Sequence, residues 1–256
     1  MLPRPLVQVW LVDLDEAAFP AHWLTQLLAP DEQLRAARFR FERDRQRYVV
    51  GRGMLRVLLG VYLGESPDQL KLVQGASGKP FLQSKSNRQP LHFNLAHAGG
   101  RAAFAFTYTA ELGIDLENVR PVEEMQNIAD RYFSSPEAET LRSFPEPQRA
   151  GAFFRVWTRK EAVVKAIGEG LGRPFDHFAV PCATDSPLEV RWLVDDPISA
   201  GDWSLCHFDP GPGFVGAVAV QCANARLEVL RLGATELNWD LMRASQPAGA
   251  RYASQH

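Results

Sequence analysis

Two acidic residues in an alternating segment have the clearest chemical potential in this sequence. In the run LGIDLE, residues 112–117, apolar side chains alternate with Gly113, Asp115 and Glu117. On a strand, Asp115 and Glu117 would share one face and lie about 7 Å apart along the chain. One interpretation is a strand that shows its acids to water. The other is a hard-cation site, because two carboxylates plus substrate phosphates suit Mg²⁺.

A third carboxylate favours the cation site. The segment from about residue 148 to 167 predicts a helix, whose apolar stripe comprises Ala150, Phe153, Phe154, Trp157 and Val164. Glu161 falls near the middle of this stripe, where a carboxylate is costly unless it is paired or bound to metal. Lys165 lies one turn further on. The alternative is a surface pair of Glu161 and Lys165, worth only about 0.2–0.5 kcal/mol.

Basic residues that could bind phosphate are concentrated in one segment. Eight arginines occur between residues 35 and 56: Arg35, Arg38, Arg40, Arg43, Arg45, Arg47, Arg52 and Arg56. The planar guanidinium group suits bidentate contact with phosphate. A solvated helix face explains most of the eight, and one or two facing a site would be sufficient.

Two glycine-containing segments could also approach a phosphate. Residues 75–80, GASGKP, lack the spacer and the Ser/Thr of a Walker A loop, so we reject that motif. Lys79 could place a charge on a phosphate, or could be an ordinary turn lysine. Residues 94–100, NLAHAGG, link two strand-like runs, and their small residues allow an anion nest of backbone N–H groups. His97 could donate to a phosphate or serve a structural purpose.

The composition excludes several classes of protein. With 46% hydrophobic and 23% charged residues the chain is an ordinary globular protein, and a net charge of −2 argues against a general nucleic-acid binder. No stretch approaches the roughly 20 apolar residues of a membrane span. We expect no signal peptide, because no basic segment precedes a small-residue cleavage site. Cys182, Cys206 and Cys222 are odd in number and far apart, which excludes a disulfide framework or a zinc knuckle. This use of cysteine predicts that the protein resides in the reducing cytoplasm.

The predicted elements form two groups without strict β-α-β alternation, which favours an α+β protein with two lobes. Strands are expected at 6–14, 91–95, 102–108, 112–116, 188–194, 203–208 and 214–220, and helices at 30–60, after 121 and at 148–167. Only residues 109–111 separate two of the strands, which predicts a hairpin. We expect an N-terminal lobe at 1–108, a C-terminal lobe with the metal site at 109–232, and a partly flexible extension at 233–256. No sequence repeat relates the lobes.

Taken together, these segments resemble the Sfp-type (surfactin-type) 4′-phosphopantetheinyl transferases. The matching segments, in order, are FERDRQRYVVGRGMLR, SGKPFL, FNLAHAGG, LGIDLE and FFRVWTRKEAVVKAIGEGL. They span about residues 30–171, with weaker likeness as far as the strand at Phe214. The combination of G-x-D-x-E with a downstream W-x-x-K-E-x-x-x-K is far more specific than any single segment.

The resemblance implies two similar α/β lobes related by a pseudo-two-fold axis, with coenzyme A in the cleft between them. It implies that Asp115, Glu117 and Glu161 hold Mg²⁺, or Mn²⁺, against the pyrophosphate. Lys165 would bind a phosphate oxygen, and Glu161 would act as general base, directly or through water. The residues implied to hold the 3′-phosphate and the pyrophosphate are Lys79, His97, Arg47 and Arg35.

The resemblance also implies the partner. A serine hydroxyl of an apo carrier protein would attack the β-phosphate and release adenosine 3′,5′-bisphosphate. The carrier would belong to fatty acid, polyketide or nonribosomal peptide synthesis. We expect a monomer that needs neither nucleic acid nor a membrane.

Two positions depart from the family pattern. The family loop often has serines on both sides of the histidine, where this chain has Ala96 and Ala98. Backbone N–H groups or arginines must replace those hydroxyl contacts. Glu32 stands where some relatives have a basic residue, which bears on the first contact to the 3′-phosphate and on nearby Arg35.

Two other classes of function are considered. A Mg²⁺-dependent phosphohydrolase would use water as nucleophile and consume coenzyme A without a protein acceptor. A binding module would recognise coenzyme A or a carrier without chemistry, and would have no need of Asp115, Glu117, Glu161 and Lys165 together.

Overall fold

The computed structural model shows two halves built from the same succession of elements, and describes residues 5–16, 21–75, 78–83, 90–168, 173–183, 190–194 and 202–233. The first half begins with strand β1 (Leu6–Asp13) and continues with helices α1 (Ala21–Leu27), α2 (Pro30–Ala36) and α3 (Glu42–Leu63). The 3₁₀ turn η1 (Pro67–Gln69) leads to the small hairpin of β2 (Leu72–Gln74) and β3 (Pro80–Leu82). The half closes with β4 (His92–Ala98) and β5 (Arg101–Thr107).

The second half repeats this order. Strand β6 (Leu112–Asn118) is followed by helices α4 (Met125–Tyr132), α5 (Ser135–Ser143) and α6 (Glu146–Ile167). The 3₁₀ turn η3 (Phe175–His177) leads to the pair of β7 (Phe178–Ala179) and β8 (Arg191–Trp192). The strands β9 (Ser204–Phe208) and β10 (Phe214–Val220) come next, and β11 (Arg226–Leu232) is the last described strand.

Sheet topology and helix length confirm the similarity of the halves. The first half has the strand order β1-β5-β4 and the second has β6-β10-β9, so in each the first strand lies beside the last. The last helix before each hairpin, α3 or α6, has 22 residues. The predicted α+β fold with two similar lobes is therefore confirmed, although the two lobes share no detectable sequence repeat. No described helix could span a membrane.

The predicted hairpin between residues 102–108 and 112–116 is wrong. β5 pairs with β1 and with β4, so both of its edges are occupied, and β6 instead pairs with β10 in the second sheet. The segment 94–100, expected as a link between strands, contains most of β4, and His97 is the next-to-last residue of that strand.

The last strand returns to the first sheet. β11 pairs with β1 in parallel, from Leu6 opposite Arg226 to Val12 opposite Leu232. The segment 109–232, expected to form the C-terminal lobe, thus contributes one strand to the N-terminal sheet. A parallel partner for an edge strand needs a long connection, and here the whole second half provides it. The expected flexible extension, residues 233–256, lies outside the described residues apart from Gly233.

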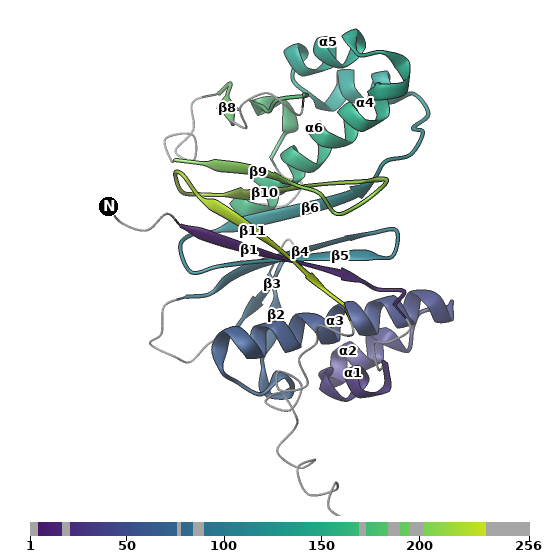
Figure 1. The fold of residues 1–256 in the computed structure, drawn as a ribbon, viewed down its shortest axis with the longest axis vertical. Helices are drawn as coiled ribbons and strands as arrows, with labels where there is room; N and C mark the ends of the chain where they lie inside the picture. Colours follow the sequence, from purple (N-terminus) through teal and green to yellow (C-terminus); the bar gives the residue numbers. More distant parts are fainter. Residues whose placement is uncertain are drawn as a thin grey trace, which may run out of the picture.

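The two sheets lie face to face between the two groups of helices (Figure 1). Their shared core contains Val7, Val9 and Leu11 of β1 and Ala103 and Ala105 of β5, together with Leu112, Ile114, Leu116, Phe208, Val218 and Val220. The alanines of β5 are small, which lets the sheets approach closely. β6 therefore turns its apolar side chains toward the other sheet, and its other face lies against α6.

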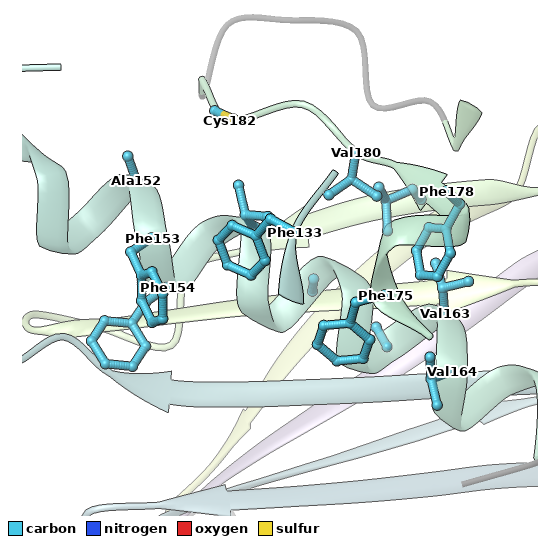
Figure 2. Close-up of a cluster of buried hydrophobic side chains, with 14 of the residues drawn as sticks. Phe133, Ala152, Phe153, Phe154, Val163, Val164, Phe175, Phe178, Val180 and Cys182 are labelled. Carbon is cyan, nitrogen blue, oxygen red and sulfur yellow. The ribbon is translucent and has the colours of Figure 1, made fainter. Parts of the chain in front are cut away.

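A separate core fixes α6 to the second sheet. Figure 2 shows aromatic side chains from α6, from the residue after α4 and from the segment before β8 lying together. The ring centroid of Phe153 lies 5.3 Å from that of Phe133 and 5.3 Å from that of Phe154. α6 is buried on most of its circumference, beyond the single apolar stripe expected, because it is covered by the sheet on one side and by α5 and the β7 segment on the other.

A buried ion pair also holds α6. The ammonium of Lys160, fully buried, lies 2.8 Å from Glu137 Oε2 on α5 and donates to the carbonyl oxygens of Phe175 and Phe178. Glu137 also accepts from the backbone N–H of Val180. The pair thus ties three segments together around the helix.

We expect Glu137→Gln to destabilise the protein by about 3 kcal/mol, because removing one partner leaves a buried charge without compensation. Urea unfolding followed by circular dichroism would show a lower midpoint with an unchanged slope. The exposed Glu139→Gln variant on the same helix is the control and should unfold like the wild type. Equal midpoints for the two variants would contradict the role of the pair.

Candidate active site

β6 and α6 bring the predicted carboxylates to one place. The predicted alternation in β6 is confirmed. Leu112, Ile114 and Leu116 lie in the core between the sheets, and Asp115 and Glu117 lie on the face toward α6. Gly113 lies directly under the helix. A Cβ there would overlap the carbonyl oxygen of Ala162 and the backbone nitrogen of Ala166. This close backbone approach places the last turns of α6 beside the acidic face of β6.

Asp115 pairs with Lys165 at the crossing of strand and helix. Asp115 is 6% exposed, and its Oδ1 lies 2.6 Å from Lys165 Nζ. The ammonium also donates to the carbonyl oxygen of Ile114 at 3.3 Å. Asp115 Oδ2 is buried and has no hydrogen-bond partner. An acceptor without a donor in a buried position is costly, so this oxygen is available for a cation.

Burial and neighbouring negative charge destabilise ionised carboxylates here. Desolvation raises the pKa of Asp115 from 3.8 to about 7; the ammonium of Lys165 opposes this rise, and Glu161 and Glu117 add to it. Burial also raises the pKa of Glu161, with a further contribution from Glu117. The three predicted ligands are thus close enough to act on one another electrostatically. A bound cation would relieve their repulsion.

The carboxylates do not form a closed cage. Glu117 Oε2 lies 3.2 Å from a guanidinium nitrogen of Arg120, which also stacks on Phe154. Within the described part of the chain, no three Asp, Glu, His or Cys side chains stand in a ready-made metal geometry. The donor chemistry fits a hard divalent ion, and its binding would replace contacts to Lys165 or Arg120.

Two basic residues of the first half, His97 on β4 and Arg35 on α2, lie within electrostatic reach of each other. His97 is exposed, yet enough protein surrounds the ring to lower its pKa, and the positive charges of Lys165 and Arg35 lower it further. His97 is therefore within electrostatic reach of both halves. The guanidinium of Arg35 lies 5.5 Å from the ring centroid of Tyr48.

Arg47, a residue of α3, lies against the turn between β4 and β5 and forms an ion pair with Asp15. Its Nε and a terminal nitrogen donate to the two carboxylate oxygens of Asp15 at 2.7 and 2.5 Å. Gly100, with φ of +87°, passes so close that a Cβ would collide with Asp15 and lie 2.9 Å from Arg47. The glycine thus brings the turn against the arginine.

Lys79 is placed differently from the other basic candidates. Its ammonium donates to Glu111 Oε2 at 3.0 Å, to the carbonyl oxygen of Leu112 at 3.1 Å and to that of Lys165 at 3.2 Å. A phosphate would have to displace one of these acceptors.

Two polar residues make structural contacts near the site that the sequence did not indicate. Glu32 is buried at 3% exposure; it caps α2 through the backbone nitrogen of Ala29 and pairs with Arg52 and Arg56, which fixes it as a structural residue. Asn94 accepts from the backbone N–H of Ile114 at 3.2 Å and so joins β4 to β6. A buried asparagine within an apolar strand was the signal that could have identified this contact.

Comparison with known proteins agrees with this arrangement. Residues 111–220 match the model of the 4′-phosphopantetheinyl transferase superfamily, and residues 18–108 match that of the N-terminal part of 4′-phosphopantetheinyl transferase. The 4′-phosphopantetheinyl transferase HetI of Nostoc sp. is 38% identical over 214 residues, which are 84% of this chain and 87% of the relative.

Two further relatives carry the same description. The 4′-phosphopantetheinyl transferase psf-1 of Bacillus pumilus is 28% identical over 72% of this chain and 77% of its own length. The 4′-phosphopantetheinyl transferase AcpT of Salmonella typhimurium is 37% identical over 56% of this chain and 70% of its own length.

These matches, over both halves of the chain, show an enzyme of phosphopantetheine transfer. The chain belongs to the 4′-phosphopantetheinyl transferase superfamily.

Proposed function

We propose that the protein transfers the 4′-phosphopantetheine arm of coenzyme A to a serine of an apo carrier protein, in a Mg²⁺-dependent reaction. The observation that carries this proposal is the partnerless buried oxygen of Asp115 beside Lys165, in the field of Glu117 and Glu161. Such a site suits a cation and a phosphate together.

Asp115, Glu117 and Glu161 would hold the divalent ion. Their oxygens are hard ligands, and their mutual repulsion falls when a cation binds. When bound, Mg²⁺, with Mn²⁺ as an alternative, supplies positive charge to the pyrophosphate oxygens on which negative charge develops.

Lys165 and Glu161 would act on the reacting groups. Lys165 lies within 2.6 Å of Asp115 and is about one-third exposed, so its ammonium can reach a phosphate oxygen. Burial raises the pKa of Glu161 and makes the ionised carboxylate a stronger base. It would accept the proton of the serine hydroxyl, directly or through a water molecule.

Arg35, Arg47 and His97 would bind the phosphates of coenzyme A from the first half. The positive charges of Arg35 in the first half and Lys165 in the second both act on His97. Such a concentration of positive charge would favour the binding of a phosphate between the halves. Arg47 would extend the basic surface beyond the β4–β5 turn. Lys79, the fourth residue predicted for this role, is left out of the proposed phosphate site because three oxygens already accept from its ammonium.

The transfer balances without a further reactant. The serine oxygen forms a bond to the β-phosphorus, and the bond from this phosphorus to the bridging oxygen breaks. The leaving group is adenosine 3′,5′-bisphosphate, and the serine proton goes to Glu161. Alignment of the attacking and leaving oxygens and stabilisation of charge are the main contributions expected from an enzyme of phosphoryl transfer.

Incubation with coenzyme A, Mg²⁺ and a panel of apo carrier proteins tests this function. We expect one or more carriers to gain the mass of a phosphopantetheine unit, and a carrier with its acceptor serine changed to alanine to gain none. Consumption of coenzyme A without any modified carrier would instead favour a phosphohydrolase. If the protein binds coenzyme A but neither modifies a carrier nor consumes coenzyme A, it is a binding module.

Stability should depend on pH and Mg²⁺ through Asp115. Burial raises the pKa of this carboxyl to about 7 in the folded protein, against 3.8 in the unfolded chain. Between these values the folded state binds more protons, so the free energy of unfolding falls as the pH rises. Cation binding to the ionised carboxylates opposes this loss.

At about pH 8, Mg²⁺ at about 100 times its Kd should add about 2.7 kcal/mol to the free energy of unfolding. This corresponds to a rise in Tm of roughly 5–10 °C for a chain of this size. At about pH 4 the rise should be much smaller, because protons compete for the ligands. Differential scanning calorimetry at both values measures it; an equal Mg²⁺ effect in Asp115→Asn would place the ion elsewhere.

A further inference from the structure

An ammonium group outside the acidic site links the segments that carry it. Lys79 precedes β3, and its Nζ donates to Glu111, just before β6, and to the backbone of both β6 and α6. His92 Nδ1 lies 3.0 Å from the second oxygen of the same Glu111 carboxylate. We refer to Lys79, Glu111 and His92 as the Lys79 clamp.

The two backbone carbonyl groups that accept from Lys79 lie where α6 crosses β6 at Gly113, one on the strand and one on the helix. Leu112 immediately precedes Gly113, and a Cβ at Gly113 would lie 2.8 Å from the carbonyl carbon of Lys165. The two backbone acceptors of Lys79 are therefore at the point where α6 rests on β6. One ammonium group joins strand and helix at this point.

The end of α6 needs such a donor. The last four carbonyl groups of a helix have no intrahelical partner, and a cation near them is favourable. Gly168 N–H satisfies the carbonyl of Val164, and the ammonium of Lys79 satisfies the next one, of Lys165. The clamp thus fixes the turn from which the Lys165 side chain reaches Asp115.

The carboxylate of Glu111 is committed to this contact. Burial would raise its pKa, but the hydrogen bonds and charges of Lys79 and His92 hold the pKa below its usual value. The side chain of Lys79 is 20% exposed, against 53% for Glu111. The ammonium is therefore the more enclosed member, and all of its N–H groups have acceptors.

We propose that Lys79, held by Glu111 and His92, is a positioning residue that sets α6 against β6, rather than a ligand of coenzyme A. The clamp acts through Lys165 and Glu161, so this inference rests on the proposed function. A displacement of about 1 Å at reacting groups is enough to lower catalysis by about a hundredfold. Loss of the clamp should therefore lower kcat and leave the affinity for coenzyme A nearly unchanged.

The test compares Lys79→Met, Glu111→Gln and the double variant, with exposed Lys71→Met in the same half as control. Transfer kcat is measured with saturating coenzyme A and a carrier that the wild type modifies, and the Kd for coenzyme A by calorimetry. Lys79→Met should lower kcat about tenfold or more, and Glu111→Gln a few-fold, since charge-assisted hydrogen bonds are lost. The Kd should change less than about twofold in each variant.

The double variant distinguishes the two roles of Lys79. If Glu111 acts through Lys79, the double variant should be no slower than Lys79→Met, because both changes remove one interaction. A phosphate ligand would behave in the opposite way. Lys79→Met would weaken the binding of coenzyme A by about tenfold or more at unchanged kcat. Glu111→Gln would free the ammonium of Lys79 and tighten the binding of coenzyme A.

Either that pattern, or wild-type kcat in Lys79→Met, overturns the positioning role. Circular dichroism at the assay temperature confirms that each variant is folded. The wild-type reaction in the same assay tests the proposed function by itself: if the wild type modifies no carrier, the proposed function fails. The ratio of variant to wild-type rates tests only the clamp.

Discussion

Asp115→Asn should lower the rate of phosphopantetheine transfer by about a hundredfold to a thousandfold, the range found when one preorganised group that stabilises developing charge is removed. Asparagine keeps the shape of the side chain but loses its charge. A neutral amide is a weak ligand for Mg²⁺, and the ammonium of Lys165 loses its partner at 2.6 Å. Both the ion and the lysine would then be misplaced.

The same variant should not be less stable in the absence of metal. The pKa of Asp115 is raised to about 7, which means that ionisation of this carboxyl opposes folding at neutral and higher pH. A neutral amide removes that cost, so the Tm at about pH 8 without Mg²⁺ should stay equal or rise. Exposed Glu123→Gln is the control and should match the wild type in rate and Tm. A rate within about tenfold of the wild type would move the metal site away from Asp115.

Gly113→Ala should damage both stability and activity. A Cβ at this position meets backbone atoms of α6 at Ala162 and Ala166, and backbone cannot turn aside as a flexible side chain does. The helix must move away from β6, with a cost of about 1–3 kcal/mol for overpacking. Because Glu161 and Lys165 lie on this part of the helix, kcat should fall by about a hundredfold.

Urea unfolding and the carrier-modification assay measure the two effects of Gly113→Ala. The matched control is Gly151→Ala near the start of α6, where a Cβ meets only the end of the Arg155 side chain, at 3.3 Å. That variant should be as stable as the wild type or more so, since alanine favours the helix. If Gly113→Ala retains the wild-type kcat, the close crossing does not position the site.

The parity of β6 was predictable from the sequence because alternation on a strand is a local property. Leu112, Ile114 and Leu116 had to face one side, and this left Asp115 toward the other. Helical periodicity predicted an inward position for Glu161, but this side chain is only partly buried in the structure and is not among the buried residues of α6. These local patterns, combined with the family motifs, were sufficient for the two-lobed fold and for its superfamily.

Long-range pairing was not predictable in this way. A three-residue separation suggested a hairpin of β5 and β6, but the choice depends on β1, which occupies the free edge of β5 from far away in the sequence. The pairing of β11 with β1 joins residues about 220 positions apart. The contact of Lys79 with the end of α6 is likewise a product of packing, and a lysine in a glycine turn gives no sign of it.

The return of β11 to the first sheet means that the two halves cannot be separated as independent modules. A fragment that ended at residue 108 would leave the β1 edge unpaired and would expose the apolar face that β6 and β10 now cover. The complementary fragment would carry a strand with no sheet of its own to join. Each piece would offer an open strand edge beside apolar surface, which is the combination that promotes association between chains. Gene splitting would therefore yield fragments that rebind each other or aggregate, and unfolding should proceed as one cooperative event for both halves.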